Sequence, residues 1–210
     1  MNFQEFLEHS RLDSKDYQRE GVEWCIDREQ GVYLDEEREQ IDQETSSPQS
    51  QYCRGGIVAD EMGLGKTIMM IATIVCNFTM PTLIVLPNVL LEQWKEQIYK
   101  TTGHRAIVYH GQVKKILTVK QLQHMPIILT TYGTVLADAR KDKKLQQVKW
   151  GRIICDEAHH LRNRRTKVAK VVGSLQTKIM WLITGTPIQN HINDLFSLFD
   201  ILKISNKPSL

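Results

Sequence analysis

The feature that most constrains this chain of 210 residues is a run of glycines, a lysine and a threonine between two apolar segments. Residues 57–59 are apolar and predict a buried strand, and residues 68–75 predict a buried helix. A strand, a glycine-rich turn, Lys-Thr and a helix in this order form a P-loop, in which backbone N–H groups converge on nucleotide phosphates. Asp60 stands where the usual first glycine would be. An ordinary glycine-rich turn before a helix therefore remains the alternative at this point.

If the turn is a P-loop, its residue types have separate tasks. Gly63 and Gly65 would let the backbone close around the phosphates. Lys66 would reach the β- and γ-phosphates, and the Thr67 hydroxyl would hold Mg²⁺. The stretch thus predicts ATP and Mg²⁺ as ligands.

A second motif lies about ninety residues later. The apolar run 152–155 predicts a strand that ends in the adjacent acids Asp156 and Glu157. Hydrolysis of Mg·ATP needs one carboxylate for the metal, which suits Asp156, and another to orient the attacking water, which suits Glu157. A metal cluster with His159 and His160 is the alternative. Its spacing is wrong, because a zinc-binding H-E-x-x-H motif separates the two histidines by one helical turn.

Three strings together resemble a known family. Residues 60–67 (DEMGLGKT), 156–159 (DEAH) and 182–190 (LITGTPIQN) closely resemble motifs I, II and III of the Swi/Snf-type ATPases of helicase superfamily two. The resemblance covers residues 16–202. It implies a motor of two RecA-like lobes, of which this sequence holds the first, so that a second lobe is an expected partner.

The resemblance also implies the residues that bind ATP. An adenine-recognition element precedes motif I in the family, and the Gln18 amide could both donate to and accept from the adenine edge. A glutamine that caps a helix or faces water is the alternative. The expected ATP-binding set is Tyr17, Gln18, Asp60, Glu61, Met62, Gly63, Leu64, Gly65, Lys66 and Thr67, with Lys66, Asp156 and Glu157 catalytic and Thr67 and Asp156 on the metal.

In the family, motif III connects the nucleotide site to the nucleic-acid cleft and to the second lobe. The resemblance assigns this coupling to Thr184, Gly185, Thr186 and Gln189, with His159 placed to hydrogen-bond across to their loop. His160 departs from the pattern, since the family often has Arg or Asn there.

Three further loops are expected on a DNA backbone by the same resemblance. Thr hydroxyls and backbone N–H groups suit phosphate oxygens and read no bases, so duplex DNA bound without sequence specificity is the expected partner. Nearby lysines at 114, 115 and 120 could add attraction. Taken singly, each loop could equally be a surface turn. The expected contacts are Pro87, Asn88, His110, Gly111, Thr130, Thr131 and Tyr132.

Alternation of apolar strands and helices predicts an α/β fold: a single RecA-like P-loop domain with a mainly parallel sheet and helices on both faces. The predicted divisions are a helical segment (1–30), an acidic and Ser/Pro/Gln-rich mobile insert (31–53), lobe one (54–203) and a tail toward the second lobe (204–210). Predicted strands cover 57–59, 81–87, 106–109, 126–132, 152–155 and 179–184, and predicted helices cover 68–75, 90–99, 167–175 and 193–202. The last helix is expected to bury Leu195, Phe196, Phe199 and Leu202.

Composition limits the class of protein. Apolar residues make up 41% and charged residues 24% of the chain, which is ordinary for a globular domain. The four cysteines are widely spaced, and Cys76 and Cys155 lie in apolar runs, so buried free thiols are expected. No signal peptide or membrane-spanning run is visible. We expect an intracellular, soluble and monomeric fragment without membrane contact, nuclear in a eukaryotic cell or located in a virion or viral replication site.

Charge is distributed unevenly along the chain. Segment 31–53 holds six acids and one arginine, a net charge of −5. The whole chain carries +3, so the remainder carries +8, which is compatible with a polyanionic partner.

The function predicted from these features is the ATP-binding lobe of a DNA-stimulated ATPase that moves along duplex DNA. Two alternatives remain: a strand-separating helicase of the same superfamily, and a nucleotide-dependent binding module that does not hydrolyse ATP. A pure switch would not need the carboxylate of Glu157.

Overall fold

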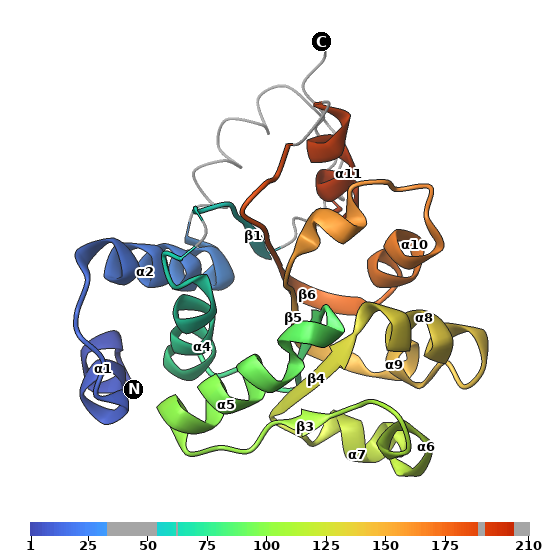
Figure 1. Ribbon diagram of the computed structural model, residues 1–210, viewed down its shortest axis with the longest axis horizontal. Helices are drawn as coiled ribbons and strands as arrows, with labels where there is room; N and C mark the ends of the chain where they lie inside the picture. Colours follow the sequence, from blue (N-terminus) through green and yellow to red (C-terminus); the bar gives the residue numbers. More distant parts are fainter. Residues whose placement is uncertain (33–53, 62, 189–191, 204–210) are drawn as a thin grey trace.

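A computed structural model describes residues 1–32, 54–61, 63–188 and 192–203. Within them, six parallel strands form one sheet in the order β1-β6-β5-β2-β4-β3 (Figure 1). The predicted α/β fold with a parallel sheet is confirmed. The strands are β1 (Arg54–Val58), β2 (Thr82–Leu86), β3 (Ile107–Val108), β4 (Ile127–Thr131), β5 (Lys149–Cys155) and β6 (Gln176–Ile183).

Helices cover both faces of the sheet, as predicted (Figure 1). One face carries α1 (Phe3–Ser10), α2 (Asp16–Gln30), α4 (Lys66–Cys76) and α5 (Leu91–Thr102). The other carries α7 (Val119–Gln123), α8 (Tyr132–Arg140), α9 (Lys144–Gln147), α10 (Lys167–Gly173) and α11 (Asn193–Ile201). The remaining short elements are α6 (Val113–Ile116) and the 3₁₀ turns η1 (Asn88–Leu90) and η2 (Ala158–Leu161).

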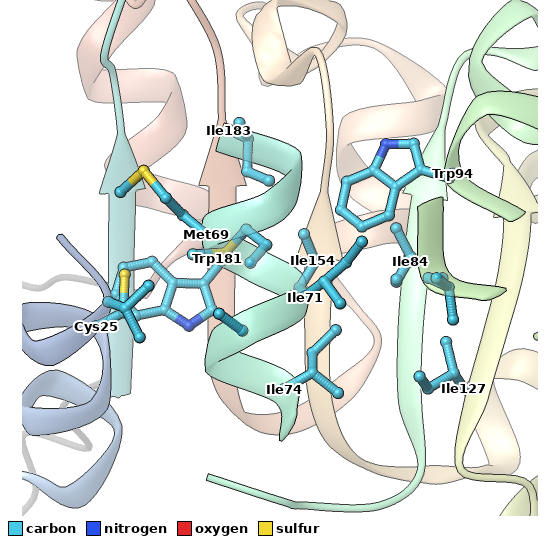
Figure 2. Close-up of a cluster of buried hydrophobic side chains, with 14 of the residues drawn as sticks. Cys25, Met69, Ile71, Ile74, Ile84, Trp94, Ile127, Ile154, Trp181 and Ile183 are labelled. Carbon is cyan, nitrogen blue, oxygen red and sulfur yellow. The ribbon is translucent and has the colours of Figure 1, made fainter. Parts of the chain in front are cut away.

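The alternation of side chains along the strands divides the interior into two cores. In β2, Ile84 and Leu86 face α4 and α5, whereas Leu83 and Val85 face the opposite helices. Both sets are fully buried, which explains why the strand is a continuous apolar run. Figure 2 shows the first core, with side chains of α4 beside those of the strands.

The N-terminal helices belong to this first core. Phe6 of α1 and Val22 of α2 are fully buried in the same cluster as α4. A capping box of Asn2 and Glu5 fixes the start of α1. Segment 1–30 is thus packed against the lobe by a shared core.

A buried ion pair joins the end of α2 to the sheet. The carboxylate of Glu29 (1% exposed) receives hydrogen bonds from both Nε and Nη2 of Arg152 (0% exposed), a residue of β5. Trp181 Nε1 and Asn77 Nδ2 also donate to this carboxylate, at 2.8 and 2.7 Å. The end of α2, the end of α4 and strands β5 and β6 are therefore joined at one charged group.

The boundaries differ from prediction in several places. β3 spans only two residues instead of 106–109, and Tyr132 begins α8 instead of ending β4. The fully buried residues of α11 and its C-terminal end are Ser197, Leu198, Ile201 and Leu202, so Leu202 is the member of the predicted face that is fully buried. Leu195, Phe196 and Phe199 are half-buried. Many residues of α11 are apolar, and the position of the sheet decides which side is covered.

Some predictions concern residues outside the described ranges, among them the acidic insert, the tail 204–210 and Cys53. The three described cysteines are free; Cys25 and Cys155 are buried and Cys76 is half-buried. Burial raises the pKa of Cys25 to about 12. Among the described helices, none combines the length and the apolar character needed to cross a membrane.

Candidate functional site

The P-loop, the motif II acids, motif III and the predicted DNA loops lie at or just beyond the C-terminal ends of strands, which is where open α/β sheets place their ligands. The predicted adenine-recognition residues Tyr17 and Gln18 lie instead on α2. The strand order divides these loops into two groups. The P-loop follows β1, Thr184–Thr186 follow β6, and Asp156 and Glu157 follow β5. The three loops predicted to contact DNA follow β2, β4 and β3, on the other half of the edge.

The P-loop has the backbone that its sequence predicts. Gly63 and Gly65 have φ values of +90° and +80°, a region that disfavours L side chains. Lys66 begins α4, so the N-terminus of that helix opens into the loop. Lys66 Nζ donates to the carbonyl oxygens of Asp60 and Glu61 at 2.6 and 2.7 Å. These bonds hold the ammonium group at the mouth of the loop, and Met62 lies outside the described residues.

Gln18 lies against the P-loop although it is 46 residues away in the chain. Its Nε2 donates to Leu64 O at 3.1 Å, and the residue is 7% exposed. A Cβ at Gly65 would come within 2.4 Å of this Nε2. Gln18 is therefore neither a helix cap nor a side chain in open water, and it supports the loop directly.

A pocket of about 460 Å³ opens between α2 and the P-loop. Its walls include Tyr17, Trp24, Leu64 and Met69. Tyr17 and Trp24 are 42% and 40% exposed, so both aromatic rings are accessible. Tyr17 belongs to the predicted ATP-binding set, whereas Trp24 does not. The volume and aromatic walls suit a flat, partly apolar ligand.

Asp156 is held by two residues that lie far from it in the chain, Trp94 and Tyr132. Trp94 Nε1 donates to Asp156 Oδ2 at 2.7 Å, and the Tyr132 hydroxyl donates to Asp156 O at 2.7 Å. Burial raises the pKa of Asp156, while the Trp94 hydrogen bond and the charge of Lys66 act in the opposite direction.

Glu157 has an unusual backbone conformation. Its φ of +49° is left-handed, which is costly for a residue with a side chain and often found at functional sites. Its carboxylate lies 2.9 Å from His159 Nδ1. His159 in turn stacks on His160, whose ring lies 5.3 Å from that of Tyr132. The strained turn therefore presents Glu157 at the sheet edge with its side chain oriented by a histidine.

This contact revises the prediction for His159. The His159 ring bonds to Glu157, and within the described residues it forms no hydrogen bond with Thr184, Gly185 or Thr186. The Thr184–Thr186 loop is instead fixed to β1, because Thr184 N donates to Val58 O at 3.0 Å. Gln189 lies outside the described residues. Because β5 and β6 are neighbouring strands, this loop and the motif II acids follow adjacent strand ends.

The available oxygen donors fit Mg²⁺. A Thr67 hydroxyl on the first turn of α4 and the Asp156 carboxylate are hard ligands, the type that Mg²⁺ prefers. Mg²⁺ commonly binds one or two protein groups together with phosphate oxygens and water. The residues present therefore suit a metal held jointly with a nucleotide.

Three of the residues predicted to contact DNA are buried. Thr130 Oγ1 donates to Tyr109 O, Thr131 Oγ1 accepts from Thr134 N at the start of α8, and the Tyr132 hydroxyl bonds to Asp156. The expectation that these hydroxyls are available to phosphates was wrong, because the strand is covered on both faces. Asn88, His110 and Gly111 are exposed and Pro87 is half-buried, so the other predicted contacts remain accessible.

The family follows from sequence comparison. Residues 17–207 match the family described as SNF2-related domain. The chain belongs to this family. This SNF2-related domain is 40% identical over 186 residues to the DNA repair protein RAD5 of Candida albicans, and 36% identical over 183 residues to the DNA repair protein rad8 of Schizosaccharomyces pombe. Each match covers 72% of the chain but only 17% and 16% of the relative, so the chain spans about a sixth of these proteins.

A solved structure supports the same assignment. The SNF2-related domain matches the Sulfolobus solfataricus SWI2/SNF2 ATPase core in complex with dsDNA, with a TM-score of 0.68 and 31% identity. The match covers 90% of this chain and 36% of that one. The predicted resemblance and the RecA-like fold are thereby confirmed.

Proposed function

We propose that this chain is the ATP-binding lobe of a DNA-stimulated ATPase that couples Mg·ATP hydrolysis to movement along duplex DNA. The observation that carries the proposal is the arrangement of the sheet edge. The P-loop and the acids Asp156 and Glu157 lie on one half, and the exposed loops after β2 and β3 lie on the other. The solved SWI2/SNF2 ATPase core in complex with dsDNA supports a DNA partner. The names of the relatives support a role in DNA repair, and hence the nucleus of a eukaryotic cell.

Each residue of the nucleotide half has a task in this proposal. The P-loop N–H groups and Lys66 bind the phosphates, and the Gln18 amide and the Tyr17 ring orient the base. Thr67 and Asp156 would hold Mg²⁺, which neutralises charge on the phosphates when bound. Glu157 orients the attacking water and receives its proton, helped by the left-handed turn that presents its carboxylate.

Two substitutions separate binding from hydrolysis. We expect Lys66→Ala to weaken Mg·ATP affinity about 10- to 100-fold, the loss of ~1.5–3 kcal/mol typical of a charged hydrogen bond. Glu157→Gln should bind almost normally but hydrolyse ~10²–10⁴-fold more slowly, because only the water-orienting carboxylate is lost. Nucleotide titration and single-turnover hydrolysis measure the two effects.

Lys95→Ala is the matched control for Lys66→Ala, since Lys95 is an exposed lysine of α5 paired with Glu92. Lys95→Ala should change neither the affinity for Mg·ATP nor the rate of hydrolysis. If Lys66→Ala and Glu157→Gln lost affinity equally, the separate roles assigned to them would be refuted.

The DNA half gives a second prediction. Contacts by Asn88, His110 and Gly111 to phosphates predict weak binding of duplex DNA that ignores base sequence and falls steeply with salt. Fluorescence anisotropy with two duplexes of different sequence, over a salt series, measures this. Affinity that persists at high salt, or that differs between the duplexes, would contradict it.

An experiment can distinguish a strand-separating helicase from an ATPase that moves along duplex DNA without separating its strands. A strand-displacement assay on a protein that contains both lobes would detect unwinding, which the translocation proposal does not require.

A further inference from the structure

Two adjacent histidines follow the motif II acids, and the proposed mechanism gives the second of them no task. The turn η2 that holds His159 and His160 begins directly after Glu157. The two rings are stacked, with centroids 4.5 Å apart and planes inclined by 30°. Side chains at neighbouring positions of a helical turn point in different directions and do not normally face each other. Contacts outside the turn therefore hold this stack together.

One such contact lies at each end of the stacked pair. His159 Nδ1 lies 2.9 Å from the Glu157 carboxylate. On the other side, the centroid of the His160 ring lies 5.3 Å from that of Tyr132, a separation typical of interacting aromatic rings. The four side chains form a continuous row, which we call the histidine stack: Tyr132, His160, His159 and Glu157.

Tyr132 gives the histidine stack a fixed base. The residue is 9% exposed, and its hydroxyl donates to Asp156 O at 2.7 Å. Tyr132 follows β4 and Asp156 follows β5, so this bond links the ends of two strands that are separated by β2. A buried ring whose hydroxyl is bonded to the backbone of motif II keeps one orientation.

His160 transmits this fixed orientation to His159. Partial desolvation lowers the pKa of His160, and the neighbouring His159 acts in the same direction, while Glu157 opposes them. At neutral pH the His160 ring is therefore mainly uncharged and packs on its neighbour without charge repulsion. Within the described ranges this ring forms no hydrogen bond, so its contribution is the contact of its flat faces.

The carboxylate at the far end of the stack needs such support. The Glu157 side chain is 30% exposed, so water competes for its oxygens, and a glutamate left to itself samples many rotamers. A catalytic group displaced by about 1 Å can lose about 10²-fold in rate. Holding His159 against Glu157 therefore matters for hydrolysis although it adds no group to the reaction.

We propose that His160 is a positioning residue for ATP hydrolysis: packed between Tyr132 and His159, it holds the His159 ring against the Glu157 carboxylate, which keeps that carboxylate aimed at the attacking water. The inference rests on the proposed ATPase function and assigns a further residue to it. His160 acts only through His159 in this role.

Single-turnover hydrolysis of radiolabelled Mg·ATP by the full chain tests this role. His160→Ala should slow hydrolysis about three- to tenfold, the effect expected from the loss of an aromatic contact, and should leave the affinity for Mg·ATP unchanged. His160→Phe should keep the unmodified rate, because phenylalanine restores the flat ring. The matched control is His104→Ala, which changes an exposed histidine just after α5 and should have no effect on either quantity.

A double-variant cycle tests whether His160 acts through His159. His159→Ala should slow hydrolysis at least as much as His160→Ala, and the variant with both changes should be no slower than His159→Ala. Losses that multiply would show that the two histidines act independently and would overturn the proposal. Thermal unfolding checks that each variant is folded, and His160→Gln removes the ring more gently if His160→Ala is not.

An NMR measurement gives a readout that requires no turnover. The Nδ1 proton of His159, bonded to Glu157, should give a resonance protected from exchange with water. We expect this resonance in the unmodified chain and in His160→Phe, and its loss in His159→Ala and His160→Ala. An unchanged resonance or an unchanged hydrolysis rate in His160→Ala would overturn the proposal. Hydrolysis that does not depend on Glu157 would instead refute the proposed function, and the NMR result would still decide whether His160 holds His159 in place.

Discussion

Arg152→Met is expected to lower the free energy of unfolding by about 3–5 kcal/mol, a large fraction of the stability of an ordinary domain. The substitution leaves the Glu29 carboxylate buried without its counter-charge; among the described residues, its remaining side-chain donors are the neutral Trp181 and Asn77. Desolvation of a charge is costly when no opposite charge compensates it. Urea unfolding followed by circular dichroism measures the change.

The double variant Arg152→Met/Glu29→Met makes this prediction specific. With both charges removed, most of the stability should return, because a buried ion pair can often be replaced by apolar side chains with little loss. Lys95→Met is the control: it breaks an exposed ion pair of α5 and should change stability by less than about 0.5 kcal/mol. A double variant as unstable as Arg152→Met alone would show that packing, not the unpaired charge, causes the loss.

The 210-residue chain by itself is expected to hydrolyse ATP very slowly and to respond little to DNA. An arginine that reaches the γ-phosphate accelerates phosphoryl transfer by a factor of ~10³–10⁵. In the Swi/Snf-type ATPases that this sequence resembles, such arginines come from the second lobe. Two arginines that follow motif II bond to other groups of the chain. Arg162 Nε donates to His159 O, and Arg164 forms an ion pair with Asp200 of α11 at 2.9 Å. A longer protein that includes a second lobe should gain this factor and be stimulated by duplex DNA.

Steady-state hydrolysis of the chain and of the longer protein, each with and without duplex DNA, checks this. Glu157→Gln in both proteins reports the background from contaminating ATPases. Turnover of ~1–10³ s⁻¹ by the 210-residue chain in the presence of DNA would show that this lobe carries a complete catalytic site.

The contacts around Asp156 show where prediction from the sequence ended. The motif itself was readable, because an apolar strand followed by two acids is a local pattern. Its supports were not, since Trp94 lies 62 residues and Tyr132 lies 24 residues from Asp156. An amphipathic helix predicts that a tryptophan is buried but does not identify its hydrogen-bonding partner.

The burial of Thr130 and Thr131 has a similar cause. The sequence showed polar side chains at a strand end, and family resemblance placed them on DNA. Only the packed sheet determines that both faces of β4 are covered and that these hydroxyls bond within the protein. The burial of Arg152 was even harder to predict, because a lone arginine at the edge of an apolar run normally reaches water. Its partner Glu29 is 123 residues away in the chain.

The sequence by itself determined the P-loop, the motif II acids, the parallel α/β class and the family, because each depends on residues adjacent in the chain. The left-handed conformations of Gly63 and Gly65 follow from the same local requirement. Tertiary structure alone decided the strand order that separates the nucleotide loops from the DNA loops and the support of the P-loop by Gln18. These features join segments distant in the chain, and their positions are fixed by the packing of two cores on one sheet.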